Sequence, residues 1–99
     1  MKLTPKSNYF IFRDMKHKVG DKVRIKSKEW FDKNRQLLRG KTYGVAPDRE
    51  NGQRCSFIDP MRKYCGREAT IASIVSEKYY TIDIDPAHLW CWVDWMFED

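Results

Sequence analysis

Two stretches near the C-terminus decide the fold that the sequence predicts: YYTIDID at residues 79–85 and LWCWVDWMF at residues 89–97. In the first stretch, apolar and polar residues alternate, which is the pattern of a half-buried β-strand. The second stretch holds three of the four tryptophans, and buried aromatic side chains supply much of the apolar area that a small domain needs. The sequence therefore predicts a strand in each stretch, followed by a last helical turn that Asp94 caps.

Upstream segments have the periodicity of further strands. Residues 18–26 place Val23 and Ile25 on one face and basic side chains on the other. Residues 67–75 alternate in a similar way, with a bulge expected near their end. Between them, residues 59–66 begin with Asp-Pro and end with Gly, which is typical of a single helical turn. Short strands with frequent turns predict a mainly β fold, a small and strongly bent antiparallel barrel.

An insertion of a different character interrupts this pattern at residues 28–56. Ser27 is placed to cap a helix over residues 28–38, because a serine hydroxyl can accept hydrogen bonds from the free N–H groups of the first turn. Residues 41–56 show no periodicity and predict a long loop, and loops of this length in compact domains are often functional. We therefore expect Tyr43, in this loop, to contact a partner.

A leader of 17 residues precedes the first strand and contains the aromatic run YFIF at residues 9–12. Exposed apolar runs are usually selected against, so we expect this run to add an edge strand to the barrel. The alternative is that the run docks on a partner. The sequence thus predicts one domain, with a leader over residues 1–17 and a barrel over residues 18–99 that carries the insertion at 28–56.

The strand and turn residues also resemble a known group of domains. The groups that carry the resemblance are Val19-Gly20-Asp21-x-Val23-x-Ile25, Met61-x-x-Tyr64-x-Gly66-x-x-Ala69-Thr70-Ile71, Tyr80-x-Ile82-Asp83-x-Asp85 and Trp90-x-Trp92-x-x-x-Met96-Phe97-Glu98. Together they resemble small SH3-like barrel domains that are encoded largely by bacteriophages and other mobile elements and are mostly of unassigned function. The resemblance implies an SH3-like barrel without known catalytic residues. It also implies that a partner could be a host or defence protein.

Charge is distributed unevenly along the chain. Residues 1–50 hold 14 Lys/Arg against 6 Asp/Glu, a net +8, whereas residues 51–99 hold 5 against 8, a net −3. A basic first half could meet phosphate or an acidic protein, or the two halves could attract each other within the fold. No run approaches the roughly 20 apolar residues of a membrane span, and no signal peptide is recognisable. We expect a cytoplasmic protein of a bacterial host cell.

Three cysteines, Cys55, Cys65 and Cys91, are an odd number in a chain without a recognisable secretion signal, which favours reduced thiols. His88 and Cys91 are three positions apart, but one such pair falls short of the ligand set of a zinc site. This spacing also does not by itself place the His88 imidazole against the Cys91 thiol, as nucleophilic catalysis would require. We expect no metal, no cofactor and no enzymatic activity, and we interpret Cys91 as a small apolar filler between two tryptophans.

Candidate partner-binding residues gather in the aromatic C-terminal third. Strand alternation places Trp90 and Trp92 on one face and Cys91 and Val93 on the other. If the tryptophans face the core, they only close the barrel; if they face outward, they line an acidic groove suited to a basic or proline-rich peptide. We expect a mixture, with one tryptophan buried and one partly exposed. The predicted partner-binding residues are Trp90, Trp92, Tyr79, Asp83, Asp85 and Tyr43.

The alternative is a nucleic-acid-binding module that uses the basic face of residues 16–39. Its candidate residues are Lys22, Arg24, Lys26, Arg35 and Arg39. Their affinity would come from phosphate contacts and fall steeply with salt. The basic face lacks interleaved aromatic residues on which bases could stack. The sequence therefore predicts a non-enzymatic interaction module that preferentially binds a protein, with nucleic acid as the alternative partner.

Overall fold

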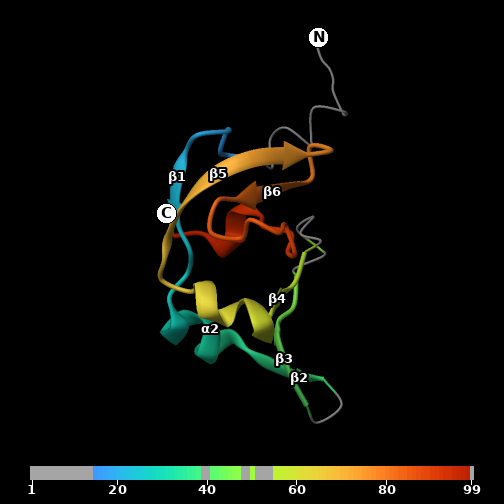
Figure 1. Cartoon of the computed structure of the whole chain (residues 1–99). Helices are drawn as coiled ribbons and strands as arrows, with labels where there is room; N and C mark the ends of the chain where they lie inside the picture. The colour runs from blue at the N-terminus through green and yellow to red at the C-terminus, as the bar shows by residue number, and fades with distance from the viewer. Residues whose placement is uncertain (1–14, 39–40, 48–49, 51–54, 99) are drawn as a thin grey trace.

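The computed structural model describes residues 15–38, 41–47, 50 and 55–98, and its strands form two three-stranded antiparallel sheets. In the first sheet the order is β1-β5-β6, formed by Lys22–Arg24, Glu68–Val75 and Tyr79–Ile82. In the second sheet the order is β2-β3-β4, formed by Gln36–Leu38, Lys41–Val45 and Phe57–Ile58. Figure 1 shows the two sheets at opposite ends of the molecule, with the C-terminal segment between them.

The predicted closed SH3-like barrel is wrong, because no ladder joins the two sheets in the part of the chain that the structure describes. The C-terminal segment, residues 89–98, lies where a barrel would close (Figure 1). It meets the first sheet through single bridges only, between Tyr80 and Trp92 and between Ile25 and Phe97. A 3₁₀ helix, η3 (Asp94–Met96), separates these two bridges, so the segment does not continue either sheet as a strand.

The first sheet follows the predicted alternation in β1 but not in β6, where Tyr80, Thr81 and Ile82 are all buried. Val23 of β1 is buried opposite Ala69 of β5, while the neighbouring Lys22 and Arg24 are exposed. The pairing of β5 with β6 shifts register between Ile71 and Ser73, which agrees with the bulge expected before the end of this strand. The predicted strand over residues 79–84 ends at Ile82.

The insertion differs from its prediction at both of its elements. Helix α2 (Lys28–Asn34) begins as expected, with the Ser27 hydroxyl accepting a hydrogen bond from the Trp30 N–H at 3.0 Å. It ends four residues early, because residues 36–38 pair with β3 and leave Leu37 67% exposed. The expected loop contains strand β3, whose Gly44 (φ 130°) lies so close to β4 that a Cβ would sit 2.4 Å from the Phe57 carbonyl oxygen.

Within the described ranges, no helix is long and apolar enough to cross a membrane.

Other predicted features of the N-terminal half lie outside the described residues. These are most of the leader with its aromatic run at 9–12, and Arg39 among the basic candidates. The predicted helical turn after β4 is present as the 3₁₀ helix η2 (Asp59–Tyr64), which buries Met61 and Tyr64.

The core is built around Trp92, which is fully buried between the sheets. Its ring meets Phe57 of β4 at 5.8 Å and Tyr64 of η2 at 5.4 Å, both edge to face. Phe57 in turn meets Phe31 of α2 at 5.2 Å. Aromatic pairs of this geometry contribute about 0.5–1.5 kcal/mol each beyond the area they bury. The C-terminal segment therefore holds the two sheets together by packing rather than by strand pairing.

Candidate functional site

A buried carboxylate sets the conformation of the chain that leads to Trp92. Asp85 is 1% exposed, and its oxygens accept hydrogen bonds from the N–H of Leu89 at 3.2 Å and of Trp90 at 3.1 Å. The same side chain accepts from the indole Nε1–H of Trp92 at 3.3 Å. Buried charge is costly unless it is hydrogen-bonded, and these three donors satisfy it. They hold the chain after the turn at residues 86–87 in an irregular conformation, with His88 at φ 55° and a bend at Trp90, instead of the predicted strand over residues 89–93.

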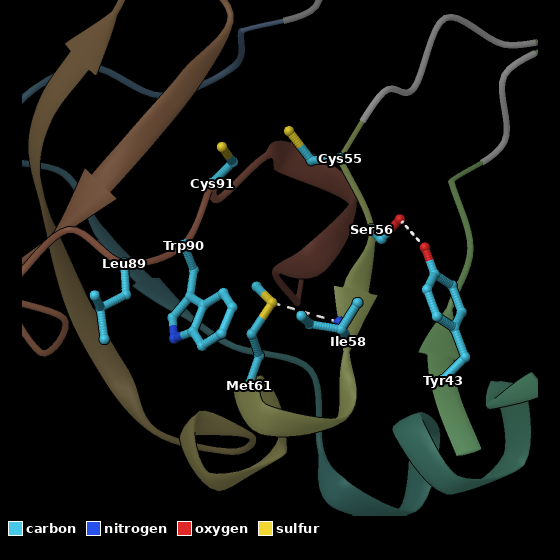
Figure 2. Close-up of a pocket in the computed structure, with 8 residues that line it drawn as sticks. All are labelled: Tyr43, Cys55, Ser56, Ile58, Met61, Leu89, Trp90 and Cys91. Carbon is cyan, nitrogen blue, oxygen red and sulfur yellow. Dashed lines mark hydrogen bonds between the residues drawn. The ribbon is translucent and has the colours of Figure 1, made fainter. Parts of the chain in front are cut away.

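The segment Leu89–Cys91 forms one wall of a groove of about 330 Å³. The opposite wall comes from β3, β4 and the residues just before β4, and η2 supplies the floor (Figure 2). The lining side chains are all uncharged: Tyr43, Cys55, Ser56, Ile58, Met61, Leu89, Trp90 and Cys91. The two walls therefore come from segments that are far apart in the sequence, and the hydrogen bonds of Asp85 fix the conformation of one of them.

Internal contacts fix the position of several groove side chains. The Tyr43 hydroxyl and the Ser56 Oγ are 2.6 Å apart, so one donates a hydrogen bond to the other at the β3–β4 wall. The Met61 Sδ accepts a long hydrogen bond, 3.4 Å, from the Ile58 N–H (Figure 2). On the other wall, Leu89 is 64% exposed and Trp90 is half-buried. The groove is thus apolar, open to solvent, and rimmed by one hydroxyl pair.

Of the six predicted partner-binding residues, the structure brings two together at this groove, Tyr43 and Trp90. Trp92 and Asp85 cannot contact a partner, because both are buried and bonded to each other. Their prediction as surface residues is corrected by this burial. The expectation of one buried and one partly exposed tryptophan agrees with the structure.

The remaining two predicted residues, Tyr79 and Asp83, belong to the first sheet and its following turn. Tyr79 begins β6 opposite Val75, and the Asp83 carboxylate accepts a hydrogen bond from the Thr70 N–H at 2.9 Å. Neither lines the groove. The expected acidic rim is therefore not formed there, since neither Asp83 nor the buried Asp85 belongs to its exposed lining.

The structure places the candidate nucleic-acid-binding residues in different environments. Arg24 donates to the Gly66 carbonyl at 2.8 Å and lies opposite Glu68 in the pairing of β1 with β5. The Lys26 ammonium lies over the Trp30 ring, 5.3 Å from its centroid. A hydrogen bond to a neutral carbonyl and a cation–π contact hold these side chains in place without neutralising their charge.

Arg35 is engaged by carboxylates rather than presented to solvent as a free cation. It lies 3.6 Å from Asp32 and 3.8 Å from Asp59. Asp32 also accepts two hydrogen bonds of 2.8 Å from Arg62, and this guanidinium holds the pKa of the Asp32 carboxyl below its usual range. Of these ion pairs, Arg35–Asp59 joins a cation of the first half of the chain to an anion of the second half, whereas Asp32–Arg62 joins the halves with the opposite polarity. The uneven charge distribution is thus partly absorbed by contacts within the fold.

Two cysteines at the groove were missed as a pair by sequence reasoning. Cys91 is exposed and is not a filler between the tryptophans, because the turn at Asp85 directs it outward. Cys55 is half-buried at the same end of the groove (Figure 2). Cys65 is buried in the core. No spacing rule could have paired Cys55 with Cys91, since they come from segments that only the tertiary fold brings together.

Among the described residues, no three His, Cys, Asp or Glu side chains are grouped so that they could hold a metal ion. The His88 N–H donates to the Asp85 carbonyl at 2.9 Å, so its backbone forms part of the turn. Comparison of the chain with protein-family models, curated proteins and solved structures found no match.

Proposed function

We propose that the protein is a non-enzymatic interaction module that binds an extended, uncharged, proline-rich segment of another protein in the groove. The observation that carries the proposal is the uncharged lining of the groove, with Tyr43 and Trp90 on opposite walls. Proline-rich segments adopt the polyproline II conformation in advance and dock on aromatic-lined grooves with little further loss of entropy. Their exposed carbonyl groups can accept hydrogen bonds from hydroxyls such as that of Tyr43.

The dimensions of the groove favour a segment that crosses it over a small molecule enclosed by it. A volume of about 330 Å³ is near the lower end of the range for small-molecule sites. Leu89 is 64% exposed on one wall, so apolar area remains uncovered there. Burial of one such side chain contributes about 1.5–3 kcal/mol to binding before other costs. A peptide with apolar side chains or prolines would cover this area.

The chemistry of the lining also argues against the other partner classes. Phosphate backbones are bound mainly by lysine and arginine, and neither residue type lines the groove. A basic peptide would need exposed carboxylates, and Asp85 is buried. The resemblance to bacteriophage-encoded domains favours a host protein as the source of the segment.

A matched pair of leucine variants tests the proposal. Leu89 lines the groove and is 64% exposed, whereas Leu37 lies on β2 away from the groove lining and is 67% exposed. Each is replaced by aspartate, and binding of a synthetic uncharged proline-rich peptide is measured by titration of tryptophan fluorescence. A glycine-serine peptide and a single-stranded oligonucleotide serve as comparison ligands.

We expect the proline-rich peptide alone to bind, and Leu89→Asp to weaken it about tenfold, which corresponds to about 1.4 kcal/mol. Leu37→Asp should leave the affinity unchanged. Equal effects of the two variants, or binding of the oligonucleotide alone, would contradict the proposal.

A further inference from the structure

The two cysteines at the groove form a pair that joins its two walls. Cys55 precedes β4, and Cys91 directly follows Trp90, whose N–H donates a hydrogen bond to Asp85. Figure 2 shows their sulfur atoms near each other at one end of the groove, which both residues line. A disulfide requires two cysteine side chains that approach each other, and the fold brings these two to the same end of the groove from segments that are far apart in the sequence.

The three thiols of the chain differ in their access to oxidants. Cys91 is exposed, whereas Cys65 is buried in the core, 6% exposed. Burial raises the pKa of the Cys55 thiol to about 11, and the neighbouring Cys91 thiol adds to the rise. Burial also raises the pKa of Cys65 to about 11. Oxidants meet accessible thiols first, so Cys91 is the expected point of attack.

We propose that Cys55 and Cys91 are a redox-modification site, at which a peroxide converts the two thiols to an intramolecular disulfide that ties β4 to the C-terminal segment. Two features of the fold carry this inference: the proximity of the two cysteines at one end of the groove and the exposure of Cys91. The substrate class is a hydroperoxide, such as hydrogen peroxide, which acts as the two-electron oxidant.

The reaction balances in two steps. The Cys91 sulfur, as a thiolate, attacks one peroxide oxygen; the O–O bond breaks, Cys91 becomes a sulfenic acid, and the released hydroxide takes a proton to become water. The Cys55 sulfur then attacks the Cys91 sulfur, the S–S bond forms, and the S–O bond breaks. The hydroxide that leaves takes the Cys55 proton as water. In total, two thiols and one hydrogen peroxide give one disulfide and two waters, and thiol reductants reverse the oxidation.

A disulfide at this position would fix the spacing of the two groove walls at one end. Its effect on peptide binding rests on the proposed function, whereas its formation does not. The disulfide would lie at one end of the groove that Leu89 and Trp90 line, so less of the groove would be accessible to a ligand. We therefore expect oxidation to lower the affinity for a proline-rich peptide.

The full chain, reduced and then treated with hydrogen peroxide, tests the site itself. Intact mass is measured at low protein concentration, and peptides are mapped without reduction. We expect the monomer to lose the mass of two hydrogen atoms and to yield a Cys55–Cys91 cross-linked peptide, with Cys65 still open to alkylation after unfolding. Cys91→Ser and Cys55→Ser should each abolish that loss, whereas Cys65→Ala should retain it.

Several results would overturn the assignment. A disulfide that includes Cys65, a mass loss that persists in Cys91→Ser, or only intermolecular cross-links would each do so. Oxidation of both cysteines to sulfinic acids without a cross-link would do so as well. Thermal melting of each serine variant confirms that it is folded before the comparison is made. If the disulfide forms but no peptide binds in either redox state, the proposed function fails while the modification site stands.

Discussion

The carboxylate of Asp85 accepts a hydrogen bond from the indole Nε1–H of Trp92 at 3.3 Å, and both side chains are buried. This contact links two structural roles of the C-terminal segment. Trp92 packs between the sheets, while the other bonds of Asp85 hold Leu89 and Trp90 in the segment that forms a wall of the groove. Stability and the shape of the candidate site therefore depend on one carboxylate.

Replacement of Asp85 by asparagine should destabilise the protein. The amide has one acceptor oxygen in place of the two that now accept three hydrogen bonds, so at least one buried donor loses its partner. An unsatisfied buried group costs about 1–3 kcal/mol. Urea unfolding measures the loss, and Asp83→Asn, at an exposed carboxylate close by, is the matched control. Equal free energies of unfolding for the two variants would show that Asp85 does not have this role.

Trp92 and Trp90 should respond differently to truncation. Trp92→Ala removes a fully buried ring that meets Phe57 and Tyr64, and it should cost about 3–5 kcal/mol of stability. Trp90 is half-buried, so Trp90→Ala should cost clearly less. Chemical denaturation of both variants gives the comparison. A larger loss for Trp90→Ala than for Trp92→Ala would mean that the core is not centred on Trp92.

Alkaline pH should weaken the fold through Tyr80. Its hydroxyl donates to Asp94 at 2.6 Å and accepts from the His17 N–H at 3.0 Å. Burial, and then the bond to Asp94, raise the pKa of the Tyr80 phenol well above its usual value of 10.0. The unfolded chain therefore loses this proton more readily than the folded chain. The contribution of the group is intact below pH 10 and is lost progressively as the pH rises beyond it.

Stability measured against pH in wild type and Tyr80→Phe isolates this effect. The variant should be less stable at neutral pH by about 1–3 kcal/mol, because both hydrogen bonds of the hydroxyl are lost. Above pH 10 the gap between the two proteins should narrow, since phenylalanine does not titrate. A gap that stays constant or widens above pH 10 contradicts the expected shift.

Oxidation of the Cys55–Cys91 pair should raise the stability of the protein. The disulfide would close a long loop of the unfolded chain, and such cross-links contribute about 2–4 kcal/mol. Calorimetric melting of the peroxide-treated and reduced protein measures the difference, with Cys91→Ser treated identically as the control. A fall in melting temperature that only the wild type shows would indicate that the disulfide strains the groove walls instead.

Local patterns in the sequence were enough to predict much of the core. Period-two alternation placed Val23 and Ile25 on one face, and the structure buries both. The start of α2 was also predictable, because the cap at Ser27 depends on residues three positions apart. These features depend on interactions within a strand or a single turn, which is the range that sequence patterns report.

The parts that could not be predicted depend on contacts between distant segments. Residues 36–38 continue a helical pattern, yet they pair with β3. Residues 89–93 alternate like a strand, but the side chain of Asp85 offers their N–H groups a local partner that competes with strand pairing. Because these two segments do not adopt their predicted structures, the protein forms two separate sheets in place of a barrel. The groove was only half anticipated, since Tyr43 and Trp90 were named for it but its cysteines and its uncharged floor were not.

The measurement that tests the central claim most directly is amide chemical-shift mapping of the ¹⁵N-labelled full chain during titration with an uncharged proline-rich peptide. The account predicts shifts concentrated at Cys55–Ile58 and Leu89–Cys91, the two walls of the groove, with Lys22–Arg24 of β1 unaffected. Shifts confined to β1 and its basic neighbours, or no saturable shift at the groove, would contradict it.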